Sequence, residues 1–487
     1  MIWPARYFFP VAMLVWAMST SWVASPTLAQ EPDTAADTPT AADAGATAAD
    51  VEETGNEVPA SPGSPTATGP GSPIATGSGS ELAAPPVSST GKIGQAEAGT
   101  SEEMSPEEYR EELLKDPEYV AELDKRAAAY EKTRANLAKA VADQRETFVR
   151  YLNRDDRTPA ARTQFFEQRN VVQQRLDENY EAALNLSMIG EYNEDAITFL
   201  VTMIQHRFEN SIYDSSTLQG ATFLMDNNSQ LEYIWKAAAR SAVTTGQFET
   251  ARRIYDVLTK PEVLGDKEFN DTDASLNFFL EEHEKKFKQE MKIREKEAAD
   301  DNLPQVLLKT TQGDVVIELY INQAPSAVAH FIKLVESGFY EELDFQLVIQ
   351  DMLALSGDPA GDGLGNSGNF LKDEHERADA RHGLRGSLIM AKIPQDDAGN
   401  FFPDSGSSQF TILLLPVVSA SEQQTVFGRV IKGMNAISRL RRVDPNKKKE
   451  KGEIIQPPDS IIEATVLRRP DTLPEPVYAD PTGSSQR

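Results

Sequence analysis

The chain has 487 residues, 40% of them apolar, so it is long enough for more than one domain with a hydrophobic core. Its net charge of −28 argues against nucleic acid or anionic lipid as a main partner, because phosphate binding requires clustered lysine and arginine. The absence of cysteine excludes disulfides, thiolate nucleophiles and thiolate metal ligands.

Residues 1–29 predict a secretory signal peptide. Arg6 precedes an apolar run over residues 7–24, and Thr27-Leu28-Ala29 offers small residues at the cleavage positions. Proline, serine and threonine interrupt the run, which favours cleavage and export over an uncleaved membrane anchor. We therefore expect a periplasmic, cell-envelope or secreted protein, with membrane contact only if the segment is retained.

Residues 30–103 predict a disordered acidic linker. The segment is dominated by alanine, threonine, proline, serine and glycine, and Lys92 is the only basic residue between Glu31 and Glu108. Too little large apolar surface is present to offset the loss of chain entropy on folding. A spacer is the favoured role, and a binding function is the alternative.

Residues 104–300 predict an all-α region. Ser105 and Pro106 are typical of a helix start, and a seam of apolar or small residues follows at three- and four-residue intervals with two polar interruptions. Its members are Val120, Leu123, Ala127, Tyr130, Leu137, Val141, Phe148 and Tyr151. An antiparallel neighbour in the same chain is favoured over coiled-coil pairing, because the helical pattern resumes after Thr158-Pro159.

Two short stretches within this region resemble each other. Gly190-Glu191-Tyr192 leads to Ala196, and Gly246-Gln247-Phe248 leads to Ala251. The second resembles a tetratricopeptide turn, in which glycine forms a tight corner and alanine lets helices approach closely. The stretches lie 56 residues apart, not the roughly 34 of a regular array. A tetratricopeptide-like scaffold implies a concave surface for protein partners, and a chance two-helix corner is the alternative.

The polar parts of the chain predict no metal site. Residues 281–301 are densely charged with opposite charges three and four apart, as expected of a solvated helix. The five histidines lack the spacing of metal ligands. His375 and His382 lie in a polar, turn-like stretch, where solvated surface residues are expected.

After Pro304 the pattern alternates as in strands. Val306, Leu308 and Thr310 share one face, and the returning strand carries apolar residues at 315, 317 and 319. A helix is expected after Ala324-Pro325, and a second around residues 434–440. The pattern predicts one β-rich barrel or sandwich domain with two helices.

An ordered series of segments carries a resemblance to the cyclophilin family. The segments are TTQGDVVIELY, APSAVAHFIKLVESGFYEELDF, GDPAGDGLGNSG, KDEHE, RHGLRGSLIMA, SGSSQFTILL and TVFGRVIKGMNAISRL. The resemblance covers Leu303 to Arg468, leaves 469–487 as a flexible tail, and implies a closed eight-stranded antiparallel barrel with two helices. It also implies a peptidyl-prolyl cis-trans isomerase that acts on X-Pro bonds of polypeptides in protein folding, without metal, nucleophile or cofactor.

The same resemblance locates a substrate groove whose residues depart from the family. The segment FQLVIQDMLALSGD stands where the family has FHRVIxxFMxQGGD, so that Leu347 occupies the position of the catalytic arginine. The groove positions by this alignment are Leu347, Met352, Leu353, Leu355, Ala391, Gln409, Thr411, Ala420 and Gln424. Ser419 aligns with the usual tryptophan. The stretch from Lys392 to Ser407 is longer than in the family.

Two functions follow from these residues. The first is an exported peptidyl-prolyl isomerase whose helical region collects clients. The second is a catalytically inactive, protein-binding cyclophilin-like module on a helical scaffold, because losing an electrostatic donor typically lowers a rate by ~10²–10³. Leu347, Met352, Leu353 and Leu355 either line an apolar pocket for a ligand or add to the core.

Overall fold

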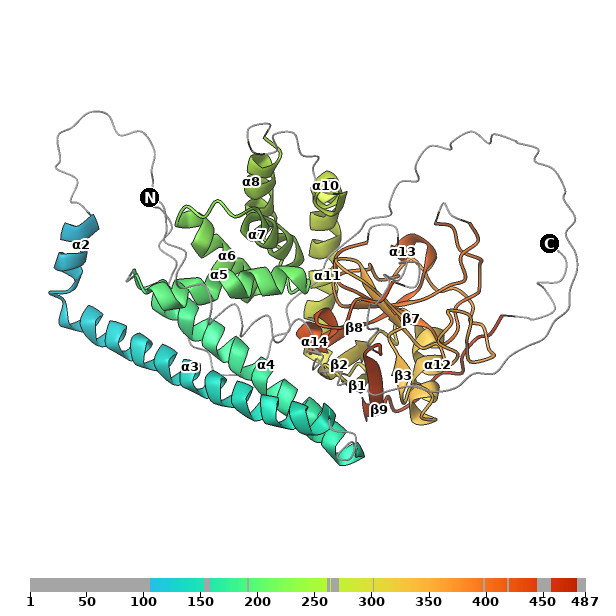
Figure 1. Ribbon diagram of the computed structural model, residues 1–487. Coiled ribbons are helices and arrows are strands. Elements are labelled where there is room, and N and C mark those ends of the chain that lie inside the picture. The colour runs from blue at the N-terminus through green and yellow to red at the C-terminus, as the bar shows by residue number, and fades with distance from the viewer. Residues whose placement is uncertain are drawn as a thin grey trace, which may run out of the picture. The chain divides into compact units, whose positions relative to one another are not determined.

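The computed structural model describes two consecutive parts of the chain, a helical region and a β-rich domain (Figure 1). The described residues are 106–152, 158–190, 192–260, 263, 271–300, 302–396, 399–417, 420–444 and 457–479. The predicted signal peptide and acidic linker lie outside these residues. In the described part of the chain, no helix is both long and apolar enough to cross a membrane.

The predicted first helix is divided in two. Helix α2 (Pro106–Leu113) ends before α3 (Pro117–Leu152), because proline fits the first turn of a helix but not its interior. Helix α4 (Pro159–Ser187) packs along α3 (Figure 1), with Tyr130 and Leu137 of the predicted seam buried. The prediction of an antiparallel neighbour in the same chain is therefore confirmed.

Shorter helices complete the helical region. They are α5 (Glu194–Glu209), α6 (Ser215–Asp226), α7 (Glu232–Thr244), α8 (Phe248–Leu258), α10 (Asp271–Phe278) and α11 (Leu280–Asp300). Gly190 and Gly246 have positive φ angles of 95° and 77°, and Ala196 and Ala251 are fully buried. The two glycine corners are confirmed, whereas a tetratricopeptide-like array stays a prediction.

Helix α11 corrects the expectation of a purely solvated helix. Glu290 and Arg294 on this helix are buried, although the sequence around them is densely charged. Glu290 accepts hydrogen bonds from Arg381 of the β-rich domain at 2.9 and 2.5 Å, and Arg381 also reaches Glu297 at 2.6 Å. The charges on this face pair with the neighbouring domain instead of only solvating the helix.

The β-rich domain is built on one curled antiparallel sheet. Its described strands are β1 (Gln305–Thr310), β2 (Gly313–Leu319), β3 (Leu343–Asp344), β4 (Leu347–Ile349), β5 (Leu353–Ser356), β6 (Ser387–Met390), β7 (Phe410–Leu413), β8 (Val426–Lys432) and β9 (Ser460–Arg468). They lie in the order β3-β9-β1-β2-β8-β6-β7-β5-β4. The predicted hairpin after Pro304 is β1–β2, with Leu308 opposite Val315.

The sheet does not match a closed eight-stranded barrel in every detail. It contains nine strands of the described residues, and none of their pairings joins the end strands β3 and β4. These strands follow each other in the chain with only residues 345 and 346 between them, so the two ends of the sheet lie close together. The structure thus shows a curled half-barrel, and full closure stays a prediction.

The core of the domain lies inside the curl. Inward residues of β1, β2, β5, β6, β7 and β8 meet Val328, Phe331 and Val335 of α12 (Pro325–Glu336) in one apolar cluster. Helix α14 (Met434–Ser438) contributes Ile437 to the same cluster. Both predicted helices are confirmed, and Gly338 follows the first with a φ of 73°.

The first half of the predicted flexible tail is bound to the domain. Val477 donates its backbone N–H to the Ser326 hydroxyl at 2.7 Å and accepts from the Lys372 N–H at 3.0 Å. The Tyr478 hydroxyl lies 3.1 Å from Nδ1 of His330. Residues 470–479 find these partners because their extended backbone pairs with the loop at 370–372.

Candidate functional site

The β4–β5 hairpin places Leu347 on the outer face of the sheet. Leu347 pairs with Leu355, and Val348 pairs with Ala354. Val348 and Ala354 belong to the inner core, whereas Leu347 and Leu355 are half-buried. Since successive side chains of a strand point to opposite faces, the arginine position of the family faces outward here and carries an apolar side chain.

A row of side chains continues across the sheet from this pair. Leu355 lies opposite Thr411 on β7, and Thr411 lies opposite Ile389 on β6. We call Leu347, Leu355, Thr411 and Ile389 the outer row. Thr411 and Ile389 are buried, so the accessible part of the row is the leucine pair at the β4–β5 end.

The remaining predicted leucine belongs partly to a second apolar cluster. Leu353 lies opposite Leu413 and packs against a cluster on the outer side of the sheet. The buried members of that cluster are Leu303, Tyr320, Ile389, Leu413, Val417 and Val426. The alternative of extra core therefore holds for Leu353, while Leu347, Leu355 and Met352 keep a half-buried apolar surface.

Gln409 is engaged by a glycine-rich loop. Its amide nitrogen donates to the carbonyl oxygens of Gly363 at 3.0 Å and Gly365 at 2.8 Å. Its backbone oxygen accepts from the N–H of Ala391 at 3.0 Å, so these two predicted groove positions are adjacent. Both amide protons are used, and Gln409 does not replace the missing donor.

The wall beyond Ala391 is formed by an additional hairpin. Phe402 donates its N–H to the carbonyl of Ile393 at 2.9 Å, and both side chains are exposed. The Phe401 N–H donates to the Gln423 side chain at 3.3 Å. Gln423 ends α13 (Ala420–Gln423), which contains the predicted position Ala420, and the half-buried Gln424 follows it. Ser419 lies outside the described residues.

Gly357 and Asp358 shape the end of β5. Gly357 has a φ of 93°, and a Cβ atom there would lie 2.3 Å from the carbonyl oxygen of Ser408. The Asp358 carboxylate accepts from the N–H groups of Ala360 at 2.8 Å and Gly363 at 2.5 Å. These residues therefore hold a turn and a close backbone approach.

Two arginines near the hairpin are directed elsewhere. Arg385 donates to the carbonyl oxygens of Ser211 and Leu414 at 2.7 and 2.6 Å, and burial lowers its pKa to about 10. Arg442 donates to the carbonyl oxygen of Ser438 at 2.8 Å and to the Ser211 hydroxyl at 3.1 Å. Neither guanidinium takes over the position of Leu347.

The histidines add no metal centre. His375 and His382, expected on the surface, are half-buried, and burial lowers the pKa of His382. His206, His283 and His330 are buried. Among the described residues, no group of histidine, aspartate and glutamate side chains is arranged to hold a metal ion.

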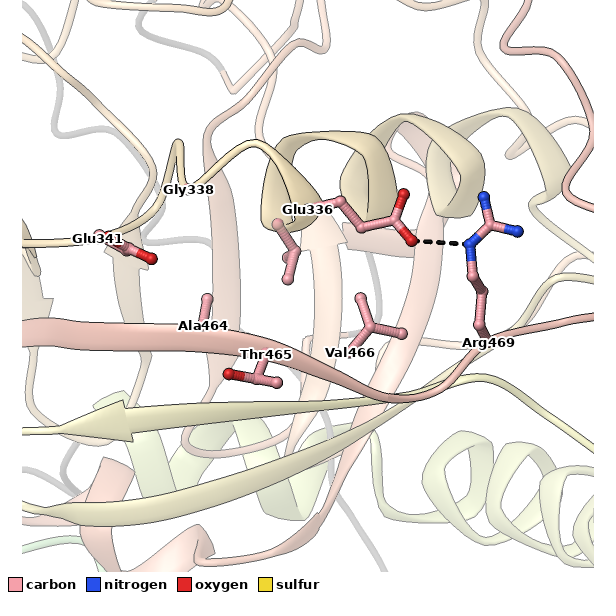
Figure 2. A pocket seen from close by; sticks show the side chains of 8 residues that line it. Glu336, Gly338, Glu341, Ala464, Thr465, Val466 and Arg469 are labelled. Carbon is pink, nitrogen blue, oxygen red and sulfur yellow. Dashed lines mark hydrogen bonds and ion pairs between the residues drawn. The ribbon is translucent and has the colours of Figure 1, made fainter.

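A shallow pocket of about 430 Å³ lies away from the predicted groove. It is bordered by the end of α12 and by β9, with Ala464 and Val466 among its lining residues. Figure 2 shows the ion pair at one side of it, between Glu336 and Arg469 at 2.7 Å. None of the predicted groove residues lines this pocket.

Sequence reasoning missed the polar contacts between the β4–β5 hairpin and the helical region. Asp351 in the β4–β5 turn bonds to Ser211, Tyr213 and Arg240 of the helical region. A signal for this contact was present, because Arg240 follows three consecutive alanines in the helix segment KAAARSAV. A charged side chain that small apolar neighbours bury requires a partner.

Comparison with known proteins agrees with the geometry. The family profile described as cyclophilin type peptidyl-prolyl cis-trans isomerase/CLD matches residues 305–466. Peptidyl-prolyl cis-trans isomerase-like 1 of Neurospora crassa is 34% identical over 169 residues, which are 34% of this chain and 96% of that protein. Its Homo sapiens namesake is 32% identical over 143 residues, which are 29% of this chain and 82% of that protein.

Among solved structures, a cyclophilin-type peptidyl-prolyl cis-trans isomerase of Cryptosporidium parvum is similar. It is 25% identical, with a TM-score of 0.29, and the match covers 34% of this chain and 99% of that one. The curled sheet, the helices α12 and α14, and the β4–β5 hairpin with Leu347 facing outward define a cyclophilin-like domain. On the sequence relationship, the chain belongs to the cyclophilin-type peptidyl-prolyl cis-trans isomerase family.

Proposed function

We propose that this protein is exported and binds proline-containing segments of other polypeptides during protein folding, using the outer row of its cyclophilin-like domain. Family membership supports the choice of ligand, and the segment over residues 1–29 supports export. The helical region serves as a tetratricopeptide-like scaffold for clients or partners. Its glycine corners with buried alanines support that role.

The observation that carries the proposal is Leu347. Rotation about a planar peptide bond has a barrier of roughly 18–20 kcal/mol, and X-Pro exchange takes tens to hundreds of seconds without a catalyst. A catalyst must therefore offer a donor whose bonds strengthen as planarity is lost. Leu347 donates nothing, whereas Leu347 and Leu355 keep apolar surface for a proline ring. The domain thus captures X-Pro segments and accelerates their exchange weakly.

A second candidate is efficient isomerisation, which family membership favours. Exchange spectroscopy on a proline peptide with the full-length chain separates the two. The proposal expects peptide binding with little acceleration by the native chain, and an increase of ~10²-fold in Leu347→Arg. Robust turnover by the native chain that is lost on replacing Leu355 or Met352 would overturn it in favour of the isomerase.

Ile349→Arg is the matched control. Ile349 lies two residues along the same strand and is exposed, so the variant adds the same charge to the same face. Ile349 pairs with Leu353 and not with Leu355, so an arginine introduced at position 349 extends from a different place on the sheet than one at position 347. A gain confined to position 347 supports a surviving groove, and equal gains at both positions would indicate only nonspecific attraction of the peptide.

A further inference from the structure

The turn of the β4–β5 hairpin is bonded to the helical region. Asp351 has a φ of 58°, and its Oδ1 accepts from the hydroxyls of Ser211 and Tyr213, both at 2.7 Å. Its Oδ2 accepts from Nη1 of Arg240 at 2.6 Å, and its own N–H donates to the Ser211 hydroxyl at 3.1 Å. Carboxylate and backbone of this one turn residue thus both face the helices.

Arg240 connects Asp351 to a partner within the helical region. Its Nε and Nη2 donate to the two oxygens of Asp273 at 2.9 and 2.8 Å, which is a bidentate pair within the helical region. The same guanidinium donates to Asp351 and, at 2.9 Å, to the Tyr213 hydroxyl. Its side chain is 2% exposed, so these bonds are sheltered from water and held by a planar fork.

The corner between α5 and α6 is also bonded to other parts of the β-rich domain. The carbonyl oxygen of Ser211 accepts from Arg385 at 2.7 Å and from the Ser438 hydroxyl at 3.1 Å. Arg385 bonds to the carbonyl of Leu414, whose N–H donates to the carbonyl of Met352 at 2.9 Å. These bonds therefore lead from Ser211, a partner of Asp351, back to Met352, the next residue of the turn.

Such support matters because β4 ends the sheet. Its only strand partner among the described strands is β5, beyond an isolated bridge from Val348 to Val443. A short end strand opens more readily than a central one. The outer row begins on this strand with Leu347, so its geometry depends on how the turn is held.

We propose that the helical region holds the β4–β5 hairpin in place and that Asp351 is a positioning residue for the outer row. This inference rests on the proposed function, because positioning matters to binding only if the row takes a ligand. Asp351 does not touch the ligand. It sets the positions of Leu347 and Leu355 in the outer row and of the neighbouring Met352. The helical region is then part of the binding unit as well as a scaffold.

Amide hydrogen exchange on the full-length chain tests the positioning directly. Asp351→Asn removes the charge and retains the shape, so the amides of Met352 and Leu414 should exchange about 10-fold faster or more. Amides of β1 and β2 should be unchanged. Unchanged exchange at Met352 and Leu414, or equal acceleration across all strands, would overturn the inference.

Glu318→Gln provides a matched control in the same domain. Glu318 pairs with Arg429 at 2.6 Å and its side chain is 11% exposed, the same values as for Asp351 with Arg240. This pair joins β2 and β8, away from the hairpin. Loss of exchange protection at Met352 in this variant would show that any lost buried pair loosens the hairpin, which contradicts a specific role of Asp351.

Peptide affinity links the positioning to binding. Asp351→Asn should weaken binding of a proline peptide by roughly 10-fold, and the milder Tyr213→Phe, which removes one of the donors, by less. Glu318→Gln should bind as the native chain does. If the native chain binds no proline peptide, the proposed function fails, while the exchange measurement still decides whether Asp351 holds the hairpin.

Discussion

The interior of the β-rich domain and its contacts with the helical region are stabilised in different ways. The domain interior is a continuous apolar cluster, filled by Phe331, Phe345, Phe410 and similar residues. The contacts bury ionised groups instead, with Glu290 against Arg381 and Asp351 against Arg240. Apolar packing tolerates exchange among residues of similar volume, whereas a buried charge depends on one specific partner.

The largest effect is expected where that dependence is strongest. Arg381 is fully buried, pairs with Glu290 and Glu297, and lies 3.7 Å above the ring of Tyr320. Arg381→Met should lower the free energy of unfolding by about 3–5 kcal/mol, because it leaves Glu290 buried with less compensation. Urea denaturation of the full-length chain measures this loss.

An exposed ion pair on α11, the helix that carries Glu290, is the control. Lys288 pairs with Glu284 on α11, and the lysine is largely exposed. Lys288→Met should change the free energy of unfolding by less than about 0.5 kcal/mol, since surface pairs contribute little. Similar losses in Lys288→Met and Arg381→Met would mean that burial does not distinguish the two pairs, and the contrast between interior and contacts would not hold.

Acid should destabilise the helical region more than the β-rich domain. Burial, aided by nearby cations, lowers the pKa of His206 to about 4 and of His283 to about 3 in the helices, and of His330 to about 4 in the β-rich domain. Each folded pKa lies below the unfolded value of about 6.5. Stability present above pH 6.5 is therefore lost as the pH falls toward 4, by roughly 3 kcal/mol per histidine at most.

The slope of the free energy of unfolding against pH is the measurement, because a loss of stability that is the same at every pH does not change it. Between pH 6.5 and 4, His206→Gln with His283→Gln should flatten the slope about twice as much as His330→Gln. Glu290 affects only the acidic end of this window, and it does so in both variants. Although burial opposes its charge, Arg294 and Arg381 lower its pKa to about 2, so its contribution is lost only below pH 4.5. Equal flattening by both variants would contradict the comparison.

The sequence predicted what periodicity and family resemblance determine. Alternation gave β1 and β2 with the inward residues Val306 and Leu308, and the position of Leu347 on the hairpin followed from alignment. Helix α11 was predicted as a helix but misread as solvated, because the pattern of charges on one helix does not reveal a partner such as Arg381, distant in the sequence. The prediction of a flexible tail was wrong for the same reason, because Val477 pairs with residues more than a hundred positions away.

The sequence predicted which residues lie together at the candidate site, but it did not predict the contacts that hold the hairpin. Leu347, Leu355 and Thr411 lie together as the alignment implies. Asp351 gave no signal in the sequence, and aspartate is a residue type that tolerates the positive φ of this turn. Its role depends on Ser211, Tyr213 and Arg240, whose approach is a tertiary event that no local propensity encodes.

The smallest expected effect separates the two glycine corners, which the sequence presents as similar. Both have positive φ, so Gly190→Ala and Gly246→Ala each carry a backbone penalty of about 1–2 kcal/mol. A Cβ at Gly190 meets nothing within 4 Å, whereas at Gly246 it would lie 2.4 Å from the Phe287 ring of α11. Gly246→Ala should therefore destabilise by about 1 kcal/mol more in urea denaturation.

Phe287 gives this difference its meaning. Its ring packs edge-on against Phe248 at 5.6 Å, on the same helix that carries Glu290. Phe287→Leu makes room for a Cβ atom at position 246. In that background, the stability lost through Gly246→Ala, measured against Phe287→Leu alone, should approach the loss caused by Gly190→Ala. An undiminished excess over Gly190→Ala would place the cost in the corner itself. A reduced excess indicates that the second corner is fitted to α11, the helix that joins the β-rich domain, and that the two corners are not interchangeable repeats.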